Sequence, residues 1–348
     1  MQKLKTLGFR LASATAVAVA VTACGGGSDP APEVVVAPPA DQAPADGPAP
    51  EVDAMASFDT YYNVCRGTDA RCLNDWGAFN STPDRVLIYS RTNGPRHASL
   101  GTQLAAGLNP PLNANNVTQA GLIRILAAEG IQADYTEDVT ILASRINNYK
   151  TVIFAGSNRD MLENQAATAT TTSCPSGATC SQDAAKTALR NYMRRGGGFV
   201  GIHNAFGGEY NWPYYEGLLG NANFYDHGPN REGVVNVVAQ DPSTAGLPAQ
   251  FAFQDEWYNL TPFPTKVKFL NTATVEPGGT GAPTVKDLHP LSWCQYYDGG
   301  RAWLTTLGHN AHSYADPAQG GLGAAHFQKM IVQAVKSTMG LTPFCTSS

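Results

Sequence analysis

The chain has 348 residues and a formal net charge of −5 at pH 7. An acidic chain without a run of Lys or Arg gives no electrostatic basis for binding nucleic acid, so that class of function is excluded. The part that follows residue 56 has about 290 residues, which is long for one domain and short for three. We interpret it as one large domain.

Residues 1–23 have the order of a secretory signal peptide. Three basic residues lie within the first ten, an apolar stretch covers 11–21, and Thr22-Ala23 precedes Cys24. The apolar stretch is too short to span a bilayer. The small residue before Cys24 resembles a lipobox, which implies cleavage before this cysteine and acylation of its sulfur. The rival interpretation is an ordinary signal peptide with an unmodified Cys24.

The segment that follows Cys24 is predicted to be a spacer. Residues 24–56 are rich in Gly, Pro and Ala and contain seven prolines, a composition that cannot bury enough apolar surface to offset the entropy of folding. Gly25-Gly26 after the cysteine resembles the sorting signal of outer-membrane lipoproteins. We therefore expect an exported protein of the cell envelope that touches the membrane through its lipid alone. Removal of the signal leaves 20 basic against 28 acidic residues, a net charge of −8.

Six cysteines remain after acylation of Cys24, an even number in an oxidising compartment. Two pairs, Cys65 with Cys72 and Cys174 with Cys180, bracket short Gly- or Pro-containing loops. We predict a disulfide in each loop and a third between Cys294 and Cys345. The alternative, a zinc cluster of cysteines, lacks any Cys-x-x-Cys spacing.

Strand and helix patterns alternate from residue 85 onward. Residues 57–84 form an N-terminal extension, 85–340 the main domain and 341–348 a tail. The β-branched and apolar runs predict strands, and the runs with helical spacing predict helices, in the order strand 85–89, helix 117–129, strand 132–135, helix 141–146, strand 151–154, helix 182–195, strand 199–202. This order indicates an α/β fold, an open and mostly parallel sheet with helices on both faces.

The pattern changes after residue 230. Strands are predicted at 234–238 and 267–270, then a hairpin of 292–297 with 301–306 joined through Asp298-Gly299-Gly300, and a final helix at 321–338. Residues 163–181 interrupt the earlier rhythm and are interpreted as a surface insertion. The glycines 196–198 precede a strand, so they fit the end of a helix better than a phosphate-binding loop.

His203 follows the predicted strand 199–202 directly. Ligands of an open parallel sheet bind at the carboxyl ends of its strands, so the imidazole of His203 is expected to enter that crevice. Other titratable residues and most of the tryptophans fall in the same half of the chain. Aromatic faces beside acids and imidazoles suit a sugar, whose C–H faces stack on rings while its hydroxyls need polar partners.

The sequence resembles the trehalose-utilisation (ThuA-like) family from Arg85 to Thr338. Seven segments carry the resemblance in order: 85–89 with Arg96-His97, Gly196 to His203, Trp212 to Tyr215, Asp255 to Tyr258, His289 to Trp293, Tyr297 to Arg301, and Leu307 to His309 before Ser313-Tyr314. The resemblance implies a fold like that of class I glutamine amidotransferases. It also implies a link to disaccharide or keto-sugar metabolism, and thus a functional connection with sugar oxidoreductases.

The chain departs from these patterns at two places. The amidotransferase fold carries a nucleophilic cysteine in the turn where this chain has Gly201-Ile-His203-Asn-Ala205, so thiol-based amide transfer is excluded. The family has an acid three residues after the Gly-His pair, where this chain has His312.

Two mechanisms remain open for one site. In the first, His203, Glu256 and His309 perform acid–base catalysis on a keto-sugar, because a proton beside a carbonyl is acidic enough for an imidazole or carboxylate to remove. In the second, a divalent metal such as zinc is held by the set His203, His227, His309 and Glu256. Contacts with the substrate are assigned to His97, Trp212, Tyr215 and Trp257. The rival of another class is a carbohydrate-binding surface lipoprotein without catalysis.

Overall fold

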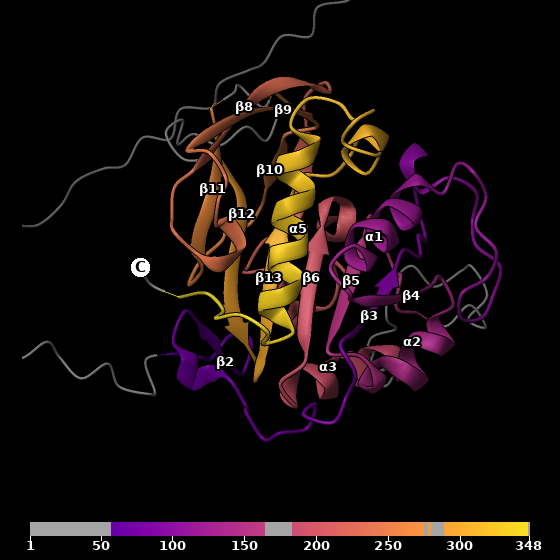
Figure 1. Ribbon diagram of the computed structural model, residues 1–348. Coiled ribbons are helices and arrows are strands. Elements are labelled where there is room, and N and C mark those ends of the chain that lie inside the picture. The colour runs from indigo at the N-terminus through magenta and orange to yellow at the C-terminus, as the bar shows by residue number, and fades with distance from the viewer. Residues whose placement is uncertain (1–56, 164–182, 275–277, 280–288, 347–348) are drawn as a thin grey trace, which may run out of the picture. The chain divides into compact units, whose positions relative to one another are not determined.

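The structure is a computed structural model that describes residues 57–163, 183–274, 278–279 and 289–346. These residues belong to one compact unit built on a large mixed sheet (Figure 1). Within the described ranges, no helix is long and apolar enough to cross a membrane. The predicted signal peptide, Cys24, the spacer, and most of the 163–181 insertion lie outside the described residues.

The parallel half of the sheet contains the five strands that position the site. They run in the order β4-β3-β5-β6-β13 and each pairs with its neighbours in parallel. Their bounds are β3 (Arg85–Tyr89), β4 (Gln132–Thr136), β5 (Thr151–Ala155), β6 (Gly198–Ile202) and β13 (Gly300–Thr305). The first four positions have the doubly wound order in which the first strand is flanked by the second and third. The predicted α/β class is confirmed.

The antiparallel half is larger than the predicted hairpin. The hairpin itself is present, because β12 (His289–Tyr297) pairs with β13 from Ser292 opposite Thr305 to Tyr297 opposite Gly300. The sheet then continues through β11 (Lys268–Thr274), β8 (Arg231–Val237) and β9 (Gln250–Asp255). A separate ribbon is formed by β7 (Phe224–His227) and β10 (Tyr258–Leu260).

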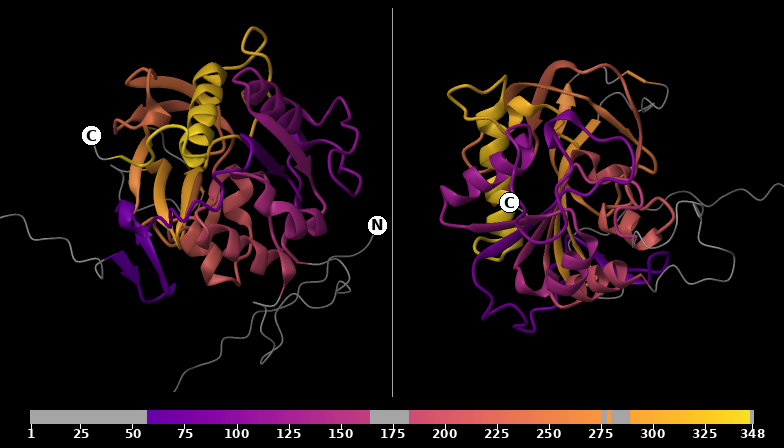
Figure 2. Two further views of the ribbon diagram at one scale, coloured as in Figure 1. Left: turned by 60° about the horizontal axis from the view of Figure 1, so that its bottom comes forward. Right: turned by 90° about the vertical axis from the view of Figure 1, so that its right-hand side faces the viewer.

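Helices cover both faces of the parallel strands, as the right-hand view of Figure 2 shows for α5 and α3. One face packs on α1 (Val117–Ala127) and α5 (Ala324–Thr338), and the other on α2 (Val139–Arg145), α3 (Ala184–Arg194) and α4 (Pro213–Leu218). Alternate residues of each strand supply the two cores. In β3, Val86 and Ile88 face the first layer, whereas Leu87 and Tyr89 face the second.

Local sequence signals fix the ends of these helices. The carboxylates of Asp138 and Asp183 accept hydrogen bonds from the backbone N–H of Thr140 and Ala185, which caps the N-termini of α2 and α3. Gly196 follows α3 with φ +95°, and a Cβ there would lie 2.5 Å from the carbonyl oxygen of Asn74. Only glycine fits this turn, which delivers the chain into β6.

The N-terminal extension is bound to the edge of the sheet. β1 (Phe58–Asp59) pairs with β2 (Val64–Gly67), and β2 pairs with the end of β12. A disulfide joins Cys65 to Cys72, as predicted. The extension is therefore part of the fold.

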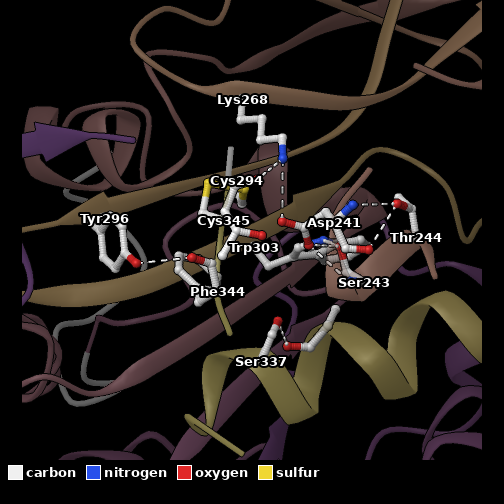
Figure 3. The surroundings of a disulfide bond; sticks show 12 residues. Asp241, Ser243, Thr244, Lys268, Cys294, Tyr296, Trp303, Ser337, Phe344 and Cys345 are labelled. Carbon is white, nitrogen blue, oxygen red and sulfur yellow. Dashed lines mark hydrogen bonds and ion pairs between the residues drawn. A yellow bond between two sulfur atoms is a disulfide. The ribbon is translucent and has the colours of Figure 1, made fainter. Parts of the chain in front are cut away.

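A second disulfide joins Cys294 in β12 to Cys345 in the tail (Figure 3). Beside it, the Tyr296 hydroxyl donates a hydrogen bond to the carbonyl oxygen of Phe344 at 3.0 Å. This predicted pairing is also present in the structure. The third predicted pair, Cys174 with Cys180, lies outside the described residues.

Candidate functional site

The site lies at the edge of the sheet where the parallel strands end. His97 stands in the loop after β3, His203 directly after β6, and His309 in the loop after β13. Glu256 comes from the antiparallel half, between β9 and β10. Together, the ligand atoms of His97, His203, Glu256 and His309 all lie within 4.8 Å of one another.

His203 is held in one orientation. It is 1% exposed and has φ +53°, a left-handed conformation that is costly for a residue with a Cβ and that occurs often at functional sites. Its Nδ1 lies 2.7 Å from the carbonyl oxygen of Thr306. Because a carbonyl only accepts, Nδ1 carries the hydrogen and Nε2 presents its electron pair to the cluster.

Tyr258 completes the surroundings of His203. Its ring stacks on the imidazole with the centroids 4.4 Å apart, and its hydroxyl lies 2.9 Å from Nε2. Since Nε2 of His203 is the acceptor, the Tyr258 hydroxyl donates this hydrogen bond. Both side chains are buried, so the pair forms a rigid floor for the site.

The carboxylate of Glu256 lies among four histidines. Its Oε2 lies 3.0 Å from His309 Nδ1, 3.6 Å from His227 Nε2, and 3.8 Å from the Nε2 atoms of both His97 and His203. Burial alone would raise the pKa of Glu256, but the neighbouring imidazoles of His309, His97 and His203 outweigh burial and hold the pKa far below its ordinary value. The carboxylate is therefore charged at neutral pH.

The pKa values of His203 and His309 are shifted in opposite directions. Burial and the neighbouring His97 and His309 hold the pKa of His203 well below its usual value, so its imidazole is neutral. Burial also opposes protonation of His309, but the carboxylate of Glu256, 3.0 Å from Nδ1, prevails and raises the pKa of His309. A neutral imidazole with a directed electron pair is the form that binds metals.

Asp255 positions two of the cluster residues without entering the cavity. Its buried carboxylate accepts hydrogen bonds from the backbone N–H groups of Gly308, His309 and Glu256 at 2.7, 3.1 and 2.8 Å. Burial raises the pKa of Asp255 to about 7, although these three donors favour its charged form. The residue ties the loop after β13 to the loop after β9.

A cavity of about 350 Å³ opens above the cluster. His97, His227, Glu256 and His309 line it on the polar side. Its aromatic wall consists of Tyr210, Phe224 and Tyr258, and further polar groups come from Asn158, Arg159 and Asn204. Aromatic rings beside a polar cluster are a combination that suits a sugar ring.

The four clustered side chains fit a divalent metal. Three imidazole nitrogens and one carboxylate oxygen are the donor set of zinc and of related transition metals. His203 also has the hydrogen bond from Nδ1 to a carbonyl that orients metal-bound histidines. The set differs in one member from the predicted one, because His97 takes the place of His227. His227 contacts Glu256 but its side chain is 35% exposed and lies outside the cluster.

Three of the four residues predicted to contact the substrate lie away from the cavity. Trp212, Tyr215 and Trp257 are 7%, 0% and 0% exposed and do not line the cavity. The Tyr215 hydroxyl and the Trp257 indole donate hydrogen bonds to the carbonyls of Ala205 and Arg231. These rings stabilise the core and have no free face for a sugar.

Sequence reasoning missed the actual aromatic wall. Phe224 and Tyr258 come from the β7–β10 ribbon, whose strands are too short to be recognised from their pattern. Tyr258 stands two residues after Glu256, a spacing that places both side chains on the same face of an extended segment. That spacing was the one available signal.

Comparison with known proteins identifies related structures. The family model described as trehalose utilisation matches residues 85–335. A ThuA-like protein from Bacteroides uniformis superposes with a TM-score of 0.51 at 19% identity, over 74% of this chain and 91% of that chain. A ThuA-like protein from Parabacteroides merdae gives 0.49 at 16% identity, over 73% and 89%. No curated protein sequence matches.

Proposed function

The chain belongs to the trehalose-utilisation family, and from this premise we propose that it acts on a carbohydrate, a disaccharide or keto-sugar derivative, with a divalent metal at the His/Glu cluster. The observation that carries the proposal is the convergence of His97, His203, His309 and Glu256 at the floor of a cavity with an aromatic wall. The charged Glu256 and the neutral His203 are already in their metal-binding forms.

The metal would supply positive charge to a carbonyl oxygen of the sugar, which acidifies the neighbouring C–H group. His97, His203, His309 and Glu256 would hold it. The stacked ring of Tyr258 and the Thr306 carbonyl keep His203 in place, and Asp255 keeps Glu256 and His309 in place.

His227 is the side chain best placed to move a proton. It lines the cavity, lies outside the four-residue cluster, and has Nδ1 2.6 Å from the Gly228 carbonyl oxygen. This contact places the hydrogen of a neutral ring on Nδ1 and leaves Nε2 as a base.

The decisive experiment combines elemental analysis of the purified domain with a screen of disaccharides and their keto derivatives. We expect a bound divalent metal and turnover of a keto-sugar. His203→Gln should lower turnover at least about 100-fold, because the amide neither titrates near neutral pH nor binds zinc well. His326→Gln, in α5 and outside the cavity, is the matched control. Unchanged turnover in His203→Gln would remove His203 from the mechanism.

The second candidate function is carbohydrate binding without catalysis, which the aromatic wall alone would support. In that case no sugar is turned over, and His203→Gln retains sugar affinity within a few-fold.

Export and lipid anchoring form a separate proposal that rests on Ala23-Cys24-Gly25. Cys24→Ser should release the protein from the membrane fraction. A variant that still fractionates with membranes would contradict the lipid anchor. In the cell envelope, a sugar oxidoreductase is the class of enzyme that would supply a keto-sugar.

A further inference from the structure

We propose that Arg159, resting on Tyr210, binds a carboxylate of the substrate, and that the protein therefore prefers an acidic sugar. The inference rests on the proposed function, because the two residues line the same cavity as the His/Glu cluster. It adds a substrate class, a sugar that bears one carboxylate.

The backbone of Arg159 is held in a costly conformation. The residue follows β5 with φ +56°, a left-handed value that is unusual for a residue with a long side chain. Three hydrogen bonds fix it: its N–H donates to the Gly207 carbonyl at 2.9 Å, and its carbonyl accepts from the N–H groups of Glu209 and Met161 at 3.0 and 2.8 Å. Conformations of this kind are enriched at functional sites.

The side chain lies between Gly94 and the ring of Tyr210. A Cβ on Gly94 would lie 2.4 Å from Cγ of Arg159, so the stem passes close over a position where only glycine leaves room. The guanidinium carbon lies 5.4 Å from the centroid of the Tyr210 ring. The Tyr210 hydroxyl donates to the Phe224 carbonyl at 3.0 Å, which fixes the ring that carries the guanidinium. The cation is thus presented on a fixed platform.

The positive charge of Arg159 has no ion-pair partner in the described part of the chain. The other arginine of the cavity, Arg96, donates to the carbonyls of Gly101 and Leu100 and pairs with Glu137 at 2.7 Å. Arg159 forms no such ion pair among the described residues. The one carboxylate in the cavity lining, Glu256, is surrounded by four histidines.

A carboxylate is the group that fits this cation. A planar guanidinium can donate two parallel N–H···O bonds to the two oxygens of a carboxylate, and one positive charge balances one negative charge. A phosphate monoester carries close to two charges at neutral pH, and no lysine lines the cavity to balance the second one. The same cavity offers the partly exposed ring of Phe224 to the ring of the sugar.

The test compares binding of a hexuronic acid, the neutral hexose of the same configuration and the hexose 6-phosphate by titration calorimetry with the metal-loaded protein. We expect the wild type to bind the uronic acid at least about tenfold more tightly than the neutral sugar, and more weakly as salt is added. Arg159→Gln should remove this preference and leave the affinity for the neutral sugar within about twofold. Arg195→Gln is the matched control, because the Arg195 guanidinium also lies over an aromatic ring, that of Phe79 at 5.8 Å, but lines another cavity.

Each outcome separates the inference from the proposed function. Equal affinity of the wild type for the acid and the neutral sugar, or an equal loss of both in Arg159→Gln, overturns the carboxylate subsite and leaves carbohydrate binding intact. Tighter binding of the phosphate that depends on Arg159 overturns the assignment to a carboxylate. If no sugar binds or is turned over, the proposed function itself fails.

Discussion

His97 and His203 face each other through the same ring atom, with their Nε2 atoms 3.1 Å apart. Because Nδ1 of His203 carries the hydrogen that it donates to the Thr306 carbonyl, the Nε2 atom of His203 that faces His97 carries none. Two neighbouring ligands of a tetrahedral metal with bonds of about 2.0–2.1 Å lie about 3.3 Å apart. The spacing therefore suits a metal, provided that His97 moves its hydrogen to Nδ1.

Asn204 decides where His97 carries that hydrogen. Its amide nitrogen lies 3.3 Å from His97 Nδ1, and a carboxylate in its place would accept a hydrogen from Nδ1 and leave Nε2 free for the metal. Asn204→Asp should raise metal affinity about tenfold, and Asn204→Leu, which only removes the donor to Nδ1, should raise it less. Competition with a chelator measures both. Equal affinities in the two variants would show that Asn204 does not orient His97.

Glu256→Gln should weaken metal binding by at least about tenfold, since an amide oxygen is a poorer ligand than a carboxylate. The same variant should lower the pKa of His309, because Glu256 is the group that raises it. NMR titration of the imidazole measures this shift in the metal-free protein. Glu232→Gln, at an exposed position in β8, is the control. A His309 pKa that does not fall would contradict the 3.0 Å contact between the two side chains.

Stability should depend on pH through Glu209. Burial raises the pKa of Glu209 to about 7 in spite of Lys186 at 2.8 Å, whereas the unfolded chain has a value of about 4.3. The folded state thus binds the extra proton between these values. The stabilisation of the folded state by protonated Glu209 is fully present below about pH 4 and is lost as the pH rises through 7. Denaturant unfolding from pH 5 to 8 should show a shallower decline for Glu209→Gln than for the wild type. An identical slope would mean that Glu209 is ionised throughout.

The two described disulfides should differ in their contribution to stability. Cys294 and Cys345 are 51 residues apart, and Cys65 and Cys72 are 7 apart. Loop-closure entropy predicts a loss of about 4 kcal/mol for the double alanine variant of the longer loop and about 2 kcal/mol for the shorter one. Urea unfolding measures both, and sugar affinity should not change. A larger loss for the shorter loop would contradict the entropic explanation.

The parallel strands and their helices could be predicted because each is a local pattern. Buried strands such as 151–155 are continuous apolar runs, and Gly196 marks the end of α3. The strand β9 also had a signal, since Phe251 and Phe253 alternate with more exposed residues. The ribbon of β7 and β10 had no such sequence signal, because its short strands are stabilised by pairing with each other and by packing on the loop after β6.

The residue types of the site were predictable, but their convergence was not. His203 was located correctly from the end of its strand. His97 and His227 are both histidines before a turn, and only the folded chain shows that His97 enters the cluster. The sequence also could not show which aromatic residues beside the acids face the cavity. Trp257 packs in the core, whereas its neighbour Tyr258 lines the cavity.

Both ends of the described chain are fastened to one strand, β12. The extension pairs with it through β2, and the tail is bonded to Cys294 within it. A pulling force on either end would therefore enter the sheet at β12, and no residue of β12 lines the cavity. The molecule should thus tolerate mechanical load, immobilisation on a surface, or a fused partner at either terminus without distortion of the His/Glu cluster.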